Sequence, residues 1–181
     1  MTKGHLVKAV KARTTAIALA GVLALSACSG TTSAQTAAVV EGRVITEQQV
    51  SEATDQLNKA LKPDPALTPA RTLNYLILAP YAIDAAASAG QPVSESAARA
   101  TPAFQALGEA PAASTIEVFR ADASLQQLDE ASGQSLTKQI AGLDVTVNPR
   151  YGRFDTRELG LVQDQPNWLI PTAPAADAPA Q

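Results

Sequence analysis

Side chains able to carry out covalent or acid–base chemistry are few in this 181-residue chain. It has one cysteine, Cys28, and one histidine, His5. Cys28 follows an apolar run that ends in Leu25, Ser26 and Ala27. Because there is no second thiol, neither an intrachain disulfide nor a thiolate metal cluster can form. The chemistry open to Cys28 is therefore modification of the thiol itself.

The segment before Cys28 has the layout of an export signal. Residues 1–13 contain four basic residues and no acidic one, and residues 14–27 are largely apolar. The core of this run, 16–27, is shorter than the roughly 20 residues of a membrane-spanning helix. Residues 25–28 resemble the bacterial lipobox, which implies cleavage before Cys28 and diacylglyceryl modification of its thiol. An ordinary secretory signal with an incidental cysteine is the alternative.

Lipid attachment at Cys28 would hold the mature protein on the extracytoplasmic face of the cell membrane. Each buried methylene contributes about 0.8 kcal/mol to membrane binding, so two acyl chains on one residue anchor stably.

Trp168, the sole tryptophan, is expected to pack the C-terminal segment onto the body. The expected organisation is a signal peptide 1–27, a flexible tether 28–37, a folded domain 38–170 and a disordered Pro/Ala-rich tail 171–181.

The charge balance narrows the classes of partner. Cleavage would remove four of the 14 basic residues and none of the 17 acidic ones, which leaves a formal charge of −7. An acidic body does not suit nucleic acid or an anionic lipid surface, because both attract basic patches. Neither GxGxxG nor GxxxxGK[ST] occurs. We therefore expect no nucleic acid or nucleotide as a partner.

Catalytic constellations are also missing from the mature sequence. Because His5 leaves with the signal peptide, Ser-His-Asp and Cys-His catalysis and the commonest zinc ligands are removed together. The spacing of the remaining candidate acids and bases is typical of solvated helix surfaces; they are Glu117, Asp122, Asp129 and Glu130. The sequence predicts no catalytic residue, no metal site and no cofactor, and hence a protein that is not an enzyme.

Hydrophobic periodicity predicts a mainly α domain of four to five helices with a small sheet. Thr46 and Gln49 form a capping-box pattern at the start of a helix. The expected helices are 47–62, 69–89, 94–107, 114–130 and a short 135–141. The expected strands are 38–45, as a strand or hairpin, and 143–147. We expect these N- and C-terminal strands to pair in one sheet, because an isolated strand is not stable.

Two prolines lie inside the expected helices. Pro80 should kink or break the second helix near Ala79, and Pro102 should interrupt the third. Ser114 and Glu117 form a capping-box pattern for the fourth helix. Its expected inward-facing residues are Ile116, Phe119, Ala123 and Leu128.

Two stretches resemble the SurA and PrsA foldases. Residues 39–47, VVEGRVITE, resemble the V-N-G-x-x-I-T start of their N-terminal chaperone domain, with Glu41 in place of the usual Asn. Residues 145–155, VTVNPRYGRFD, are similar to a V-N-P-R-Y-G-x-W/F-D segment near the end of actinobacterial lipoproteins of this group. The stretch 130–145 leaves no room for the parvulin-type isomerase domain of the full-length foldases.

The resemblance covers most of the chain between residues 39 and 168 and implies a helical chaperone lobe. It implies a membrane-anchored holdase that binds unfolded or extended segments of secreted proteins without isomerase activity. The alternative is a lipoprotein scaffold that binds one dedicated cell-envelope partner. A holdase should expose a contiguous apolar patch of several hundred Å² or more, whereas the patch of a scaffold would be smaller or shaped for one partner.

The second stretch contains a signature turn formed by Asn148, Pro149, Arg150, Tyr151 and Gly152. In a structural interpretation, Pro149 and Gly152 shape the turn. Tyr151 and Phe154 then cover an apolar edge, and Arg150 pairs with a surface acid. In a functional interpretation, the same turn borders a peptide-binding groove.

Replacing Cys28 tests the lipoprotein assignment. We expect Cys28→Ser and Cys28→Ala to leave the precursor without lipid, because no other thiol can accept the diacylglyceryl group. Metabolic labelling with a fatty-acid probe measures this. Label that persists on either variant would contradict the assignment.

Overall fold

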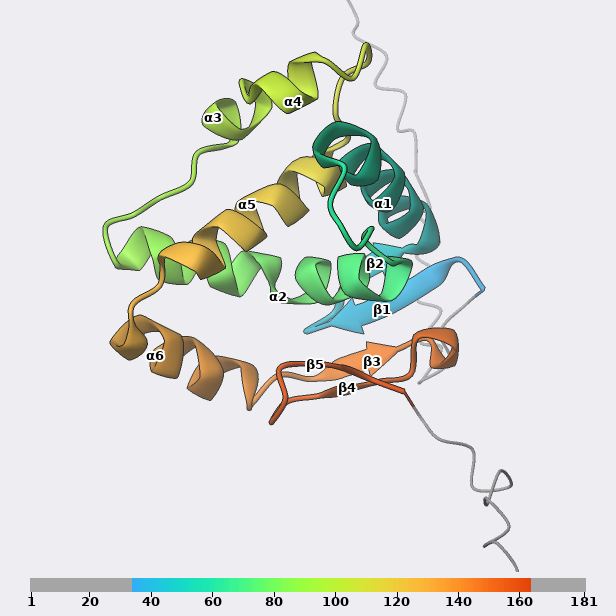
Figure 1. Ribbon diagram of the computed structural model, residues 1–181. Helices are drawn as coiled ribbons and strands as arrows, with labels where there is room; N and C mark the ends of the chain where they lie inside the picture. Colours follow the sequence, from blue (N-terminus) through green and yellow to red (C-terminus); the bar gives the residue numbers. More distant parts are fainter. Residues whose placement is uncertain (1–33, 164–181) are drawn as a thin grey trace, which may run out of the picture.

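Helix α2 (Pro69–Ser88) runs through the middle of the computed structural model, which describes residues 34–163 (Figure 1). It packs against α1 (Glu47–Leu61) and α5 (Ala113–Gln127) on one side and against strand β1 (Thr36–Val40) and α6 (Glu130–Ile140) on the other. This arrangement confirms a mainly α fold with a small antiparallel sheet, and it places α2 between the two layers.

The sheet joins the two ends of the domain. Strands β1 (Thr36–Val40) and β2 (Arg43–Thr46) form a hairpin, and β3 (Val145–Val147) pairs antiparallel with the other edge of β1, with Ala38 opposite Val147. The predicted pairing of N- and C-terminal strands is therefore confirmed. The sheet nevertheless begins earlier than expected, because Thr36 and the fully buried Ala37 belong to β1 rather than to a flexible tether.

The hairpin turn between β1 and β2 accommodates Glu41 at a position that Asn commonly occupies in such turns. Glu41 and Gly42 have φ angles of 48° and 81°, the two left-handed positions of a two-residue turn that Asn-Gly usually occupies. The Glu41 carboxylate accepts a hydrogen bond from the backbone N–H of Asp144 at 2.7 Å, and the Asp144 carbonyl accepts one from the Glu41 N–H at 2.9 Å. Glu41 thus ties the turn to the chain just before β3.

Helix α1 begins as predicted. The Thr46 hydroxyl accepts from the Gln49 N–H at 3.2 Å, and the Gln49 side chain accepts from the Thr46 N–H at 2.9 Å. Its inward stripe is also confirmed over three positions, Val50, Ala53 and Leu57. Leu61, the fourth expected position, is instead 41% exposed at the end of the helix.

A kink or break was predicted near Ala79, and of these two the break is wrong, because α2 continues through Pro80. Proline lacks an N–H, so the Leu76 carbonyl four residues earlier loses its helical partner. The Arg43 guanidinium, which reaches over from β2, donates a hydrogen bond from its Nη2–H to that carbonyl. Its Nη1 also pairs with the Glu117 carboxylate of α5 at 3.2 Å. A long-range contact therefore compensates for the missing bond inside the helix.

The predicted interruption at Pro102 is confirmed, because the helix expected for 94–107 is divided there into α3 (Glu95–Arg99) and α4 (Pro102–Gln105). The predicted helix 135–141 starts five residues earlier, where Asp129 caps α6 by accepting from the Ser132 N–H at 2.8 Å.

The predicted capping box of α5 is wrong. Ser114 lies inside the helix and is buried, and Ala112 is the capping residue without a side-chain bond of its own. The Gln56 side chain of α1 accepts from the Ala112 N–H at 2.8 Å and from the Thr115 hydroxyl at 2.6 Å. Of the expected inward residues Ile116 is buried, whereas Phe119, Ala123 and Leu128 are half-buried.

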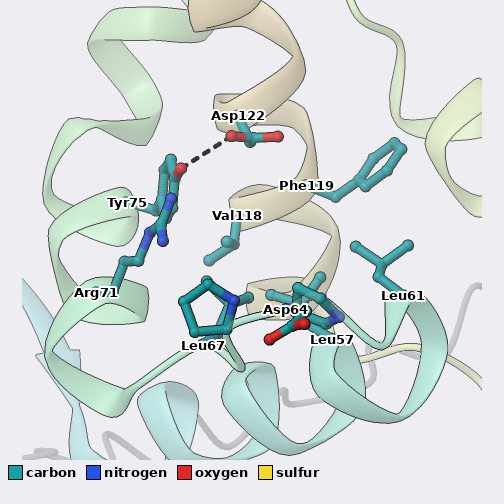
Figure 2. A pocket seen from close by; sticks show the side chains of 11 residues that line it. Leu57, Leu61, Asp64, Leu67, Arg71, Tyr75, Val118, Phe119 and Asp122 are labelled. Atoms are coloured by element: carbon teal, nitrogen blue, oxygen red, sulfur yellow. Dashed lines mark hydrogen bonds between the residues drawn. The ribbon is translucent and has the colours of Figure 1, made fainter.

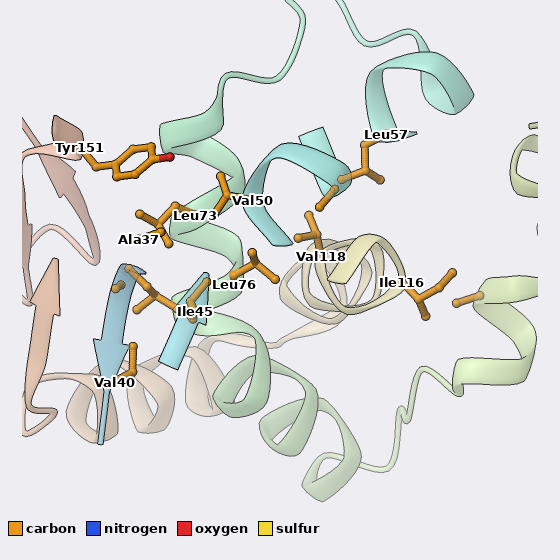
Figure 3. Close-up of a cluster of buried hydrophobic side chains, with 14 of the residues drawn as sticks. Ala37, Val40, Ile45, Val50, Leu57, Leu73, Leu76, Ile116, Val118 and Tyr151 are labelled. Carbon is orange, nitrogen blue, oxygen red and sulfur yellow. The ribbon is translucent and has the colours of Figure 1, made fainter. Parts of the chain in front are cut away.

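The main core lies where β1, β2, α1, α2 and α5 meet (Figure 3). A smaller cluster joins α2 to α6 through Leu78, Ala82, Leu136 and Ile140. A hairpin that the sequence did not indicate, β4 (Arg153–Asp155) and β5 (Gly160–Val162), follows the turn after β3. The large buried side chains of the main core include Val40, Ile45, Val50, Leu57, Leu73, Leu76, Ile116 and Val118.

A double-mutant cycle tests the compensation at Pro80. We expect Arg43→Met to lower the free energy of unfolding by about 1–3 kcal/mol, because it leaves a buried carbonyl without a donor. In a Pro80→Ala background the cost should be smaller, because the backbone N–H gained by that substitution then serves the Leu76 carbonyl. Urea denaturation gives all four values. The lost Arg43–Glu117 pair affects both backgrounds and cancels, so equal costs would contradict the assignment.

Candidate functional site

An apolar pocket opens between α1, α2 and α5, beside the loop that joins the first two helices (Figure 2). Its volume is about 230 Å³. Apolar and ring side chains dominate its wall, and three charged groups lie among them. The lining residues are Leu57, Leu61, Pro63, Asp64, Pro65, Leu67, Arg71, Tyr75, Val118, Phe119 and Asp122.

The loop between α1 and α2 is fixed by local chemistry. Lys62 ends α1 in the left-handed conformation, and the two prolines at 63 and 65 prevent the helix from continuing. The Asp64–Pro65 peptide bond is cis. The Asn58 side chain of α1 then binds Leu67 twice, accepting from its N–H at 2.8 Å and donating to its carbonyl at 3.0 Å. This loop therefore forms a defined wall of the pocket.

Packing against the core holds the apolar wall in place. Leu57 and Val118 are buried, and Phe119 stands edge-on to the buried Phe104 with ring centroids 5.1 Å apart. Leu61 is the exception, since 41% of it is exposed at the rim. An incoming apolar group would bury Leu61 further and meet a wall that needs little rearrangement.

The polar groups of the pocket are oriented by each other. The Tyr75 hydroxyl donates to one oxygen of Asp122 at 2.9 Å, and Gln126 donates to the other at 2.6 Å. Burial and the bond to Asp122 raise the pKa of Tyr75, an effect that Arg71 opposes. Arg71 lies beside the Tyr75 ring (Figure 2). The arrangement suits the binding of an apolar side chain near charged groups.

The signature turn at 148–152 lies elsewhere, and it clasps the two ends of the domain. Asn148 bonds to the β1 backbone through its N–H, to the Ala37 carbonyl at 2.8 Å, and through its side chain, to the Thr36 carbonyl at 3.1 Å. The Tyr151 hydroxyl donates to Glu47 at 2.6 Å, and Arg150 pairs with the same carboxylate at 3.4 Å. The expected surface acid is therefore Glu47, at the start of α1.

The end of this turn tolerates only glycine. Gly152 has a φ of 90°, and a Cβ at this position would lie 2.1 Å from the Val162 carbonyl oxygen of β5. Pro149 starts the short 3₁₀ turn, and Phe154 is packed against the core, as the structural interpretation expects. The turn does not line the apolar pocket, although Arg150 and Tyr151 border a smaller cavity of about 130 Å³ next to Glu47.

The four carboxylates considered for acid–base chemistry each have a partner of their own. Glu117 pairs with Arg43, and its pKa is raised by burial against the opposing effect of that guanidinium. Asp122 accepts from Tyr75, and Asp129 caps α6. Glu130 accepts from Gln134 at 3.3 Å. Within residues 34–163, no group of three or more potential metal ligands comes together.

The predicted lipobox lies outside the described part of the chain; its residues are Leu25, Ser26, Ala27 and Cys28. His5 and Trp168 also lie outside it. Among the helices that the structure describes, none combines the length and apolar character needed to cross a bilayer.

Comparisons with known protein families, with characterised proteins and with solved structures return no match to this chain.

Sequence reasoning missed the apolar pocket. It interprets Pro63 and Pro65 only as the end of a helix, and Leu61 only as part of an inward stripe. The available signal was a leucine one turn beyond the last core position and directly before a proline-rich loop. The contributions of Val118 and Asp122 depend on how α5 crosses α1 and α2, which local periodicity does not encode.

The pH dependence of stability tests the hydrogen bond between Tyr151 and Glu47. Burial and the hydrogen bond to Glu47 raise the pKa of Tyr151 from 10.0 to about 12. The neutral phenol is thus favoured in the folded state, so its contribution is complete below pH 10 and is lost as the pH rises toward 12. We expect this loss to be roughly 2 kcal/mol.

Tyr151→Phe should remove this part of the alkaline slope. Chemical denaturation of wild type and variant between about pH 9 and 12 measures the difference. Tyr75, whose pKa is also raised, keeps its own share in both proteins. Identical slopes for the two proteins would contradict the role given to the Tyr151–Glu47 bond.

Proposed function

We propose that this protein is a lipid-anchored, extracytoplasmic protein that binds segments of other polypeptides and has no catalytic step. The observation that carries the proposal is the apolar pocket between α1, α2 and α5. Its wall is built on three long helices and a fixed loop, so binding costs little ordering of the protein. The lipobox-like residues 25–28 support the anchored location.

The size of the pocket favours a side chain over a small molecule. Sites for small organic ligands and cofactors usually enclose about 300–1,000 Å³. The pocket here, at about 230 Å³, has room for one or two apolar side chains. An extended segment could place such a side chain against Leu61 and Phe119 and leave its backbone at the rim.

The distribution of apolar surface favours one dedicated envelope partner over a general holdase. Among the described residues, Val44 and Leu61 are the only large apolar side chains that are strongly exposed, at 52% and 41%. They lie on different elements, β2 and α1. A holdase for many unfolded clients would be expected to present a wider contiguous patch.

A chaperone-like holdase is the second candidate. It is supported by the resemblance of residues 39–47 and 145–155 to SurA-type chaperone segments. In either case the protein would act by binding alone and would not accelerate prolyl isomerisation.

Leu61→Asp tests the pocket as the binding site. An added carboxylate in the apolar wall should weaken partner binding on the order of tenfold or more, because the charge must be desolvated. Stability should change little, since Leu61 is exposed. Val44→Asp is the matched control, because it places the same charge on an exposed apolar residue away from the pocket.

The measurement is recovery of partners from the native envelope with wild type and both variants. Wild type and Val44→Asp should retain the same partner, and Leu61→Asp should lose it. Equal recovery with Leu61→Asp would contradict the site. Suppression of aggregation of many unrelated unfolded clients, at several-fold molar excess, would shift the proposal to the holdase.

A further inference from the structure

We propose that the pocket selects an extended segment in which an apolar residue has a lysine or arginine beside it. This inference rests on the proposed function and specifies its partner. The occupant would insert the apolar side chain between α1 and α5 and place its cation beside the Asp64 carboxylate. The pocket would therefore prefer a positively charged segment, because one of its own carboxylates has no partner among the described residues.

The charged groups of the pocket leave one carboxylate available. Asp122 already accepts hydrogen bonds from Tyr75 and Gln126. Arg71 lies against Tyr75, where it opposes the rise in the tyrosine pKa. Asp64 forms no ion pair or hydrogen bond with any residue that the structure describes, although it lines the same pocket.

The net charge of the lining is negative. Two carboxylates, Asp64 and Asp122, lie with one guanidinium, Arg71, around an apolar wall. A low-polarity wall strengthens the field of nearby charges compared with open water. A positive group held beside the apolar side chain would thus be favoured, and a negative group would be disfavoured.

The position of Asp64 lowers the entropic cost of such an ion pair. It lies between Pro63 and Pro65, whose rings fix their own φ angles, and Asn58 anchors the loop at Leu67. Exposed ion pairs are usually weak, partly because two mobile side chains must be ordered. Here only the short aspartate side chain needs to be ordered on the protein's side.

The same charges argue against the chain's own tail as the occupant. Residues 164–181 include the apolar stretch 168–170, but they contain two aspartates and no lysine or arginine. An acidic segment would not complement a pocket with a free carboxylate. A basic-flanked segment of another polypeptide fits better.

The test uses mature protein without its lipid and a set of short Gly/Ser-based peptides, each with a Leu-Phe pair. The pair is flanked by Lys, by Gln or by Glu, and binding is measured by shifts of the protein's NMR signals. We expect the Lys peptide to bind about three- to fivefold more tightly than the Gln peptide, the range of a good exposed ion pair. Near 1 M salt, where screening acts over about 3 Å, the difference should largely disappear.

Two variants distinguish the effect of the Asp64 charge in the pocket from the effect of the overall charge of the protein. Asp64→Asn should reduce the preference for Lys over Gln by at least about half. Asp55→Asn is the matched control, since it removes the same charge from an exposed position of α1 that does not line the pocket. The preference should persist in that variant.

The outcomes distinguish this inference from the proposed function. If none of the peptides binds, the proposed function itself fails. If all three bind equally, or if Asp64→Asn and Asp55→Asn behave alike, the charge preference is wrong and polypeptide binding stands. A peptide of residues 164–181 that binds more tightly than the Lys peptide would assign the pocket to the chain's own tail and overturn the inference.

Discussion

The fold depends on how the chain satisfies the Leu76 carbonyl in the middle of α2. Pro80 cannot donate to it, and α2 is the helix on which both layers pack. Arg43 supplies the donor from β2 and holds Glu117 of α5 with the same guanidinium. One side chain therefore connects hairpin, central helix and crossing helix. The crossing helix that Arg43 contacts in this way also contributes Val118 and Asp122 to the pocket.

The stabilising turn and the proposed binding pocket lie in different parts of the domain. The signature turn at 148–152 acts on the sheet side, where it binds β1 and the start of α1. The pocket lies at the opposite end of α1, on the side of the proline-rich loop. The residues that made the sequence resemble a chaperone family thus stabilise the domain, whereas the surface proposed to bind a partner is built from residues with no motif.

Sequence reasoning succeeded where the determining contacts are local. The Thr46–Gln49 box, the inward positions of α1 and the strands at both ends follow from neighbours three or four residues apart or from alternation. It failed where a distant side chain decides. Gln56 of α1 caps α5 and moves its start ahead of Ser114, and Arg43 preserves α2 across Pro80. The pocket belongs to this second class, because its walls come from three helices.

The pairing of β1 with β3 also has a consequence for how the domain forms. Ala38 and Val147 become neighbours only after more than a hundred intervening residues are available. Contacts so distant in sequence slow folding, since the entropy of closing the loop is lost before the contact forms. During synthesis the edge of β1 that pairs with β3 would remain unpaired until nearly the whole domain has emerged. A chain stopped before residue 145 would keep that strand edge open, and open edges of this kind recruit other chains.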